Sequence, residues 1–515
     1  FQPASGYWRN TYVPGDPDMR LLGARLATWD RRALGARAGL ERGVRPILQL
    51  LDPPRGAALA LELHADTGAV TGPTRLRLQV GLQGAARQGG HRPAMSVALV
   101  LDLRQHLDAG SARQFRALAT ALERARQPGD RFSLVVAGPA GGVAVGPESF
   151  RHGPLKVALA RLLGEPRSEE AGAIGLIEAV KLAGEALRAE ATGEAVLGAN
   201  VVLLATARPL GVEWEPLETL AHANALGGIL TSVVAVGDAV ALARLDRLVA
   251  AGQGNRRLLR RAEEAEALIA RELHAASRVV ARAVRLRIRL APGVELIDVL
   301  GSRRLDEVRA TRVREAESSI DRRLARDLGI AADRGEDEEG IQIVIPNFQA
   351  GDAHVILLDV VVPGPGQVAD VTARYKDVVQ LRNGVAHAHL SLPEGERAMG
   401  VAERNVLKNL LAFEMARRAR GLSGLLAAGR DGEAAALAGE FAGLLAGLRR
   451  EVPGWADDLE LAADGAFLAE YRALIASRAL ADPTTRRMIA DSLRYAAFAK
   501  LHAKFARATP EETPR

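Results

Sequence analysis

The sequence predicts a doubly wound α/β domain inserted in a β-sandwich and followed by an α-helical C-terminal region. Three observations lead to this fold class. Short apolar runs alternate with segments of helical periodicity over residues 93–277. Segments in which apolar and polar residues alternate stand before and after that stretch, as in half-buried strands. From residue 396 the chain is rich in Ala and Leu at helical spacing.

One strand organises the α/β prediction. Residues 97–101 form a continuous apolar run, which is typical of a strand buried on both faces of a parallel sheet. The run ends in Asp102, at the carboxyl edge where open α/β sheets bind their ligands. A helical segment over 111–127 and a second strand over 131–137 follow. We therefore expect Asp102 to mark the functional edge of the sheet.

The remaining elements follow from the same patterns. Two more strands of the α/β domain are predicted at 200–205 and 229–236. The charge-dense stretch 303–334 could be a helix or a long excursion. About four helices, as an antiparallel bundle or a cap, are expected between breaks at Gly429, Gly454 and Pro483. The expected sandwich strands cover residues 58–65, 74–83, 283–290, 294–300, 340–345, 353–362, 368–375 and 384–392.

These patterns divide the chain into six segments. They are an N-terminal arm and helix (1–55), the first sandwich strands (56–92), the α/β domain (93–277), the remaining sandwich strands (278–395), the helical bundle or cap (396–507) and a polar tail (508–515).

Composition excludes several classes of function. The net charge of +6 comes from 68 basic and 62 acidic residues without a basic stripe, so no nucleic-acid partner is expected. With no cysteine, the chain can form neither a disulfide framework nor a Cys-ligated zinc site. No apolar run reaches the ~18 residues of a membrane span. The sequence contains no P-loop and no Gly-x-Ser-x-Gly elbow, so we predict no cofactor and no enzyme activity.

Several short motifs resemble bacterial von Willebrand factor type A (VWA) proteins, in particular an exported subfamily with N- and C-terminal extensions. The motifs are "RPAMSVALVLDL", "QPGDRFSLVV" and "LVAAGQGN", with "LRLQVGLQG" before the domain and "VTARYKDVVQLRNG" after it. The resemblance implies a Rossmann-like VWA domain. It also implies a metal-ion-dependent adhesion site, in which Asp-x-Ser-x-Ser and two other loops hold a divalent cation.

The sequence departs from that metal site. Arg104 and His106 stand where the family has two serines, Glu170 aligns with its threonine, and Thr206 aligns with its third-loop acid. Only Asp102 is retained, so the site is predicted to be degenerate and to bind no metal. We expect the Arg104 guanidinium to replace the cation by pairing with Asp102, with Glu170 as a second candidate partner. The alternative is a metal site rebuilt from Asp102, Glu170 and Thr206.

The sequence therefore favours a non-catalytic scaffold of the cell envelope, a subunit of a larger membrane-associated complex on the periplasmic side. The alternatives are a metal-dependent VWA adhesion protein and a hydrolytic enzyme. Because the chain starts without Met, membrane contact is expected only through an upstream anchor or through a partner. For the aromatic residues of the N-terminal arm, the sequence favours packing on their own domain over contact with a partner. The candidate partner-binding residues are Tyr7, Trp8, Tyr12, Arg104 and Arg208.

Overall fold

The computed structural model describes most of the chain. The helix expected over residues 18–40, together with His106 and Glu170, lies outside the described residues. The described residues are 1–14, 47–86, 92–105, 107–139, 141–146, 154–164, 174–189, 198–208, 213–237, 242–334, 339–502 and 504–506.

Residues between 96 and 276 form an α/β unit around a six-stranded sheet of order β10-β9-β8-β5-β6-β7. All neighbouring strands pair in parallel except β6 and β7, which are antiparallel. The strands are β5 (Ser96–Asp102), β6 (Arg131–Ala137), β7 (Gly142–Val145), β8 (Asn200–Thr206), β9 (Ile229–Val236) and β10 (Gln253–Leu259). The helices are α2 (Ala109–Arg124), α3 (Pro154–Gly164), α4 (Leu176–Ala189), α5 (Trp214–Leu226), α6 (Leu242–Ala251) and α7 (Ala265–Ala276).

The predicted central strand is confirmed. Residues 97–101 of β5 are at most 1% exposed, and successive side chains enter different hydrophobic clusters. Leu99 packs with residues of α2, α3 and α7, whereas Val100 packs with residues of α4, α5 and α6. Because side chains alternate along a strand, a continuous apolar run supplies both faces of a sheet covered on both sides by helices.

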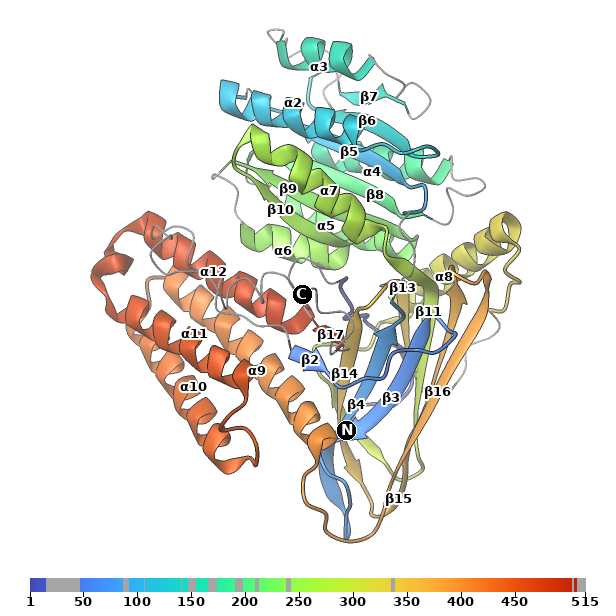
Figure 1. The fold of residues 1–515 in the computed structure, drawn as a ribbon, viewed down its shortest axis with the longest axis vertical. Helices are drawn as coiled ribbons and strands as arrows, with labels where there is room; N and C mark the ends of the chain where they lie inside the picture. Colours follow the sequence, from blue (N-terminus) through green and yellow to red (C-terminus); the bar gives the residue numbers. More distant parts are fainter. Residues whose placement is uncertain are drawn as a thin grey trace, which may run out of the picture.

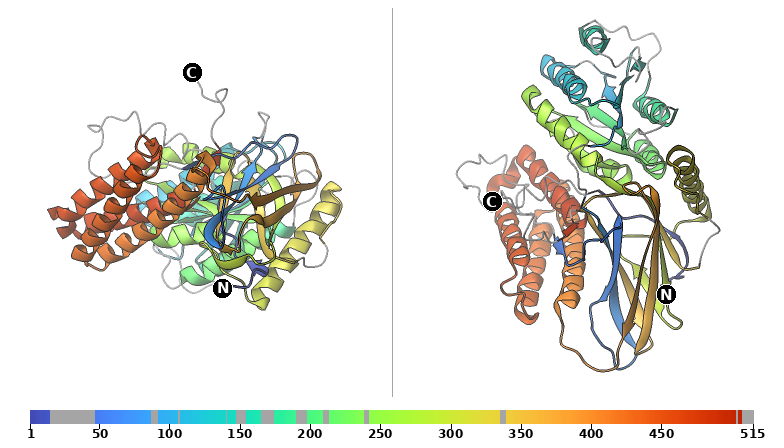
Figure 2. Two further views of the ribbon diagram at one scale, coloured as in Figure 1. Left: turned by 90° about the horizontal axis from the view of Figure 1, so that it is seen from below. Right: turned by 45° about the vertical axis from the view of Figure 1, so that its right-hand side comes forward.

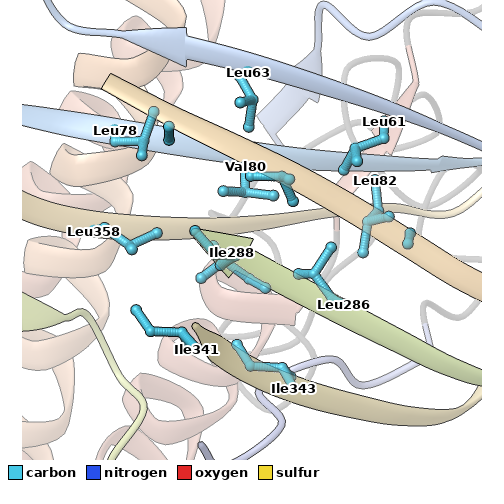
Figure 3. Close-up of a cluster of buried hydrophobic side chains, with 14 of the residues drawn as sticks. Leu61, Leu63, Leu78, Val80, Leu82, Leu286, Ile288, Ile341, Ile343 and Leu358 are labelled. Carbon is cyan, nitrogen blue, oxygen red and sulfur yellow. The ribbon is translucent and has the colours of Figure 1, made fainter. Parts of the chain in front are cut away.

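The segments in which apolar and polar residues alternate form a two-sheet region, which lies below the α/β unit in Figure 1. One sheet has the order β1-β13-β11-β15-β16 and the other β12-β14-β4-β3. Buried side chains of both sheets share one hydrophobic cluster, in which Leu78 and Val80 of β4 lie near Leu286 and Ile288 of β11 (Figure 3). The strands are β1 (Gly6–Trp8), β3 (Leu59–Ala65), β4 (Thr74–Gly84), β11 (Val279–Leu290), β12 (Glu295–Val299), β13 (Ile341–Gln349), β14 (Ala353–Val362), β15 (Gly366–Asp377) and β16 (Arg382–Leu392).

The charge-dense stretch forms a helix, α8 (Glu307–Leu328), on the outside of the five-stranded sheet. Its first turn is capped by Asp306, whose carboxylate accepts a hydrogen bond from the Arg309 amide (2.8 Å). On the buried side, Glu317 of α8 accepts from the Arg285 guanidinium of β11 at 2.6 Å. Charged residues in this stretch therefore attach the helix to the sheet.

The C-terminal helices α9 to α12 share one hydrophobic cluster. The predicted breaks are confirmed: Gly429, with a positive φ of 72° that suits glycine, stands between two helices, and α12 begins at Pro483. None of the helices that the structure describes is long and apolar enough to cross a membrane. The helices are α9 (Val401–Ala427), α10 (Asp431–Glu451), α11 (Leu459–Ala476) and α12 (Pro483–His502). A short parallel pair, β2 (Ile47–Gln49) with β17 (Lys504–Ala506), follows the end of α12.

The aromatic residues of the N-terminal arm pack inside the chain. Tyr7, Trp8 and Tyr12 are only 2–3% exposed. Tyr12 stacks on Phe348 with ring centroids 4.5 Å apart, and its hydroxyl donates to Asp352 at 2.9 Å. The proposal that these three side chains contact a partner is therefore corrected, because the chain's own sheets and helices cover them.

Candidate functional site

The carboxyl edge of the six-stranded sheet brings Asp102 and Thr206 together. Strands β5 and β8 are parallel neighbours in which Leu101 pairs with Ala205, so the next residue of each strand lies at the same edge. The Thr206 hydroxyl donates a hydrogen bond to Asp102 Oδ2 at 3.0 Å. Both side chains are buried, with Asp102 7% exposed and Thr206 fully covered.

Arg104 binds Asp102 through two parallel hydrogen bonds. Its Nε donates to Oδ1 at 2.7 Å and its Nη2 donates to Oδ2 at 2.9 Å. A planar guanidinium matches a carboxylate in this two-point geometry. The hydrogen bond to Asp102 raises the pKa of the Arg104 guanidinium above its ordinary value, so this group is a fixed cation. The pairing of Arg104 with Asp102 expected from the sequence is confirmed.

A second carboxylate closes the arrangement from the start of α5. Arg104 Nη1 donates to Glu213 Oε2, and the two side chains are 26% and 27% exposed. Glu213 stands at the N-cap position of α5, the helix that follows β8. Helices that follow parallel strands begin at the carboxyl edge of the sheet, so an acid in this place was a signal available in the sequence. Sequence reasoning nevertheless missed Glu213 and named Glu170, which lies outside the described residues.

The described donors at this edge do not fit a divalent cation. Such an ion requires several oxygen ligands with free lone pairs directed at one point. Here both oxygens of Asp102 accept hydrogen bonds from Arg104, and Glu213 is also paired with Arg104. Among the residues that the structure describes, no group of three or more His, Asp or Glu side chains is arranged to hold a metal ion.

Arg208 lies two residues beyond Thr206 and is exposed at the same edge. Its main-chain amide donates to the Thr206 hydroxyl at 3.3 Å, which fixes the first turn of the loop after β8. The edge therefore combines an ion cluster of two carboxylates and one guanidinium with an exposed arginine.

The fold and this edge define a class of protein: an open, largely parallel sheet between two layers of helices, with an acid at the end of its central strand. Comparison with solved structures places the chain in the VWA-like fold. The structure described as von Willebrand factor type A from Catenulispora acidiphila superposes with a TM-score of 0.55 at 14% sequence identity. The alignment covers 86% of this chain and 96% of that chain, so the likeness extends beyond the α/β unit.

A second similar structure is the ArnB paralog VWA2 from Sulfolobus acidocaldarius, with a TM-score of 0.48 at 13% identity over 85% of this chain and 97% of that chain. No protein-family model matches the sequence, and a search of curated proteins found no match. At 14% sequence identity, the likeness to the Catenulispora structure shows the fold alone.

Proposed function

We propose that this chain is a non-catalytic scaffold protein that binds another protein at the carboxyl edge of its α/β sheet without a metal ion. The observation that carries the proposal is the Arg104 guanidinium, which lies between the carboxylates of Asp102 and Glu213. In this proposal the arginine takes the place of the family's divalent cation and supplies one of its two positive charges.

Electrostatics supports this substitution. Two unit positive charges about 4 Å apart repel by roughly 4 kcal/mol at an effective dielectric constant of 20, and a divalent ion would double that figure. Moving Arg104 away would remove this repulsion but would destabilise the fold, because Asp102 is only 7% exposed and would lose its charged partner. The internal ion cluster is thus a self-sufficient alternative to a bound metal.

Without a metal, partner binding uses other chemistry. A VWA domain with a bound cation can recruit a partner's carboxylate as a ligand, and that route is closed here under our proposal. Arg208 is exposed at the edge, and Arg104 remains partly exposed, so both can form hydrogen bonds with a partner's acidic groups. Shape complementarity around them would supply the rest of the interface.

The wider setting is part of the same proposal. We interpret the two-sheet region as a β-sandwich with the α/β unit inserted between β4 and β11, and the chain as an exported VWA protein with a degenerate metal site. It would act at the cell envelope, on the periplasmic side, as a subunit of a membrane-associated complex. The shared core of the two sheets supports the insertion. So do the two ends of the α/β unit, where the carbonyls of Ala85 and Arg278 accept from the neighbouring amides of Gly351 and Ala350.

The test is capture of a partner from native membranes with tagged wild-type protein, in magnesium and then in EDTA. Arg104→Ala and Arg208→Ala are compared with a matched control, Arg271→Ala, which replaces an exposed arginine on α7. We expect one partner to co-purify equally in both buffers and with the control, and to be lost with the two edge variants. Loss of the wild-type partner in EDTA would instead support a metal-dependent adhesion protein.

A further inference from the structure

A cleft of about 570 Å³ lies where the N-terminal arm, the α/β unit, the two-sheet region and the C-terminal helices meet. Figure 2 shows these parts converging, with the α/β unit above the sheets and helices in the right-hand view. The walls come from residues 9–13 of the arm, α5, α6, β14, α9 and α12. Its size falls in the range of ligand-binding clefts. None of the edge residues discussed above lines it.

Arginines from four separate elements line this cleft. They are Arg9 of the arm, Arg247 of α6, Arg420 of α9 and Arg494 of α12. Segments far apart in the sequence thus place positive charge around one space. Because Arg side chains recognise carboxylates through paired hydrogen bonds, such a convergence is suited to an anionic ligand.

The two carboxylates of the lining are already engaged. Glu218 Oε2 forms an ion pair with Arg247 Nη2 at 3.0 Å, and the Arg247 guanidinium also lies 4.2 Å from the centre of the Trp214 ring. Asp246 is 8% exposed and lies 2.8 Å from Arg256. Glu218 also acts on Arg9 and Asp246 on Arg420, but neither carboxylate outweighs burial, and the pKa of both guanidinium groups stays lowered.

Arg9 and Arg420 are the two lining arginines that can pair with an anionic ligand. Among the described residues, neither guanidinium forms a hydrogen bond or an ion pair. Both are solvent-accessible in the cleft but crowded by protein atoms. Burial is the largest effect on each group and lowers its pKa. Arg303 lowers the pKa of Arg9 further while Glu218 raises it, and for Arg420 Asp246 raises the pKa while Arg247 and Arg9 lower it. An anion between them would relieve this repulsion.

Apolar side chains form the rest of the lining. Phe413 of α9, Phe498 of α12 and Leu357 of β14 face the cleft together with the arginines. A small inorganic anion would leave this apolar surface uncovered, whereas a peptide can place carboxylates on the arginines and aliphatic atoms on the aromatic rings. The combination favours a peptide that carries acidic side chains.

We propose that this cleft binds an acidic peptide segment of a partner protein, with its carboxylates on Arg9 and Arg420. The inference rests on the proposed role as a protein-binding scaffold and gives that role a second contact site, separate from the Arg104 edge. The ligand bridges the arm, the α/β unit and the C-terminal helices, so one peptide contacts three parts of the chain.

The experiment measures fluorescence anisotropy with a fluorescein-labelled hexaglutamate peptide and the full chain. Hexaglutamine serves as the uncharged control peptide. The variants are Arg9→Gln, Arg420→Gln and their combination; Arg472→Gln, an exposed arginine of α11 outside the cleft, is the matched control. Melting curves of every variant establish that it is folded.

We expect hexaglutamate to bind and hexaglutamine not to bind. Each single variant should weaken binding roughly tenfold, the usual effect of losing one hydrogen bond to a charged group, and the double variant more. Arg472→Gln should bind as the wild type does. None of the three substituted arginines lies at the sheet edge, so this result is independent of the Arg104 edge. Equal binding by the double variant, or displacement of the peptide by inorganic phosphate at the same concentration, would overturn the proposal.

Discussion

Replacing Arg104 by alanine tests the ion cluster at the edge of the sheet. The change removes two hydrogen bonds to Asp102 and the ion pair with Glu213. Removing one partner of a fully buried ion pair costs about 3–5 kcal/mol, and exposed pairs contribute about 0–1 kcal/mol. Asp102 is 7% exposed, but the Arg104 side chain is 26% exposed, so water can partly replace the guanidinium. We therefore expect Arg104→Ala to lower the free energy of unfolding by about 2 kcal/mol.

Thermal melting and chemical denaturation measure this loss. For a unit the size of the α/β unit, about 2 kcal/mol corresponds to a melting temperature lower by about 4–8 °C. A double-mutant cycle with Asp102→Asn separates the pair from other effects, because Asp102→Asn leaves no buried carboxylate to stabilise. The double variant should lose less stability than the two single variants together.

The same variant also reports on the metal question. Without the guanidinium, the oxygens of Asp102, Glu213 and Thr206 become available, so millimolar magnesium should stabilise Arg104→Ala more than the wild type. A loss in Arg104→Ala of less than about 0.5 kcal/mol, which is the range of ordinary surface substitutions, would refute the reasoning. Normal folding with unchanged partner binding would also count against a role for Arg104.

The remaining predictions concern the whole protein and two buried anchors. EDTA and added magnesium should leave the melting temperature of the wild type unchanged; a cation-dependent shift would show that Asp102 still serves a metal. Tyr12→Phe should cost about 1–3 kcal/mol at neutral pH, because the hydroxyl donates to Asp352 (2.9 Å) and accepts from the Gln349 amide (3.0 Å). Burial raises the pKa of Tyr12 well above 10.0, so the stability that the hydroxyl contributes is complete below pH 10 and is lost as pH rises through the folded-state pKa. Denaturation at alkaline pH should therefore show the free energies of unfolding of the wild type and Tyr12→Phe approaching each other. Lys500→Met should lower the free energy of unfolding by about 3–5 kcal/mol, because it leaves the buried Asp464 without the Lys500 Nζ that lies 2.7 Å from its Oδ2. Adding Asp464→Leu should restore most of that free energy, as measured by denaturant titration.

The sequence determined the features that depend on neighbouring residues. The apolar run 97–101 predicted a strand buried on both faces, and β5 has that burial because successive side chains alternate between two helical layers. Asp102 and Arg104 are two residues apart, so their pairing followed from chemistry and a short loop. The helices between Gly429, Gly454 and Pro483 followed from period and backbone constraints.

The tertiary structure decided what depends on residues far apart in the chain. Glu213 pairs with Arg104 across 109 positions. Its place at the start of a helix marked it as an acid at the sheet edge, but which cation it would meet depended on the loop after β5. The aromatic residues of the arm could have been exposed or buried, and the packing of the arm against β13 and α8 covers them. The cleft around Arg9 and Arg420 exists because the arm, α6, α9 and α12 meet at one place. Periodicity fixes which face of an element is buried, whereas the position of one element against another depends on contacts that no single segment encodes.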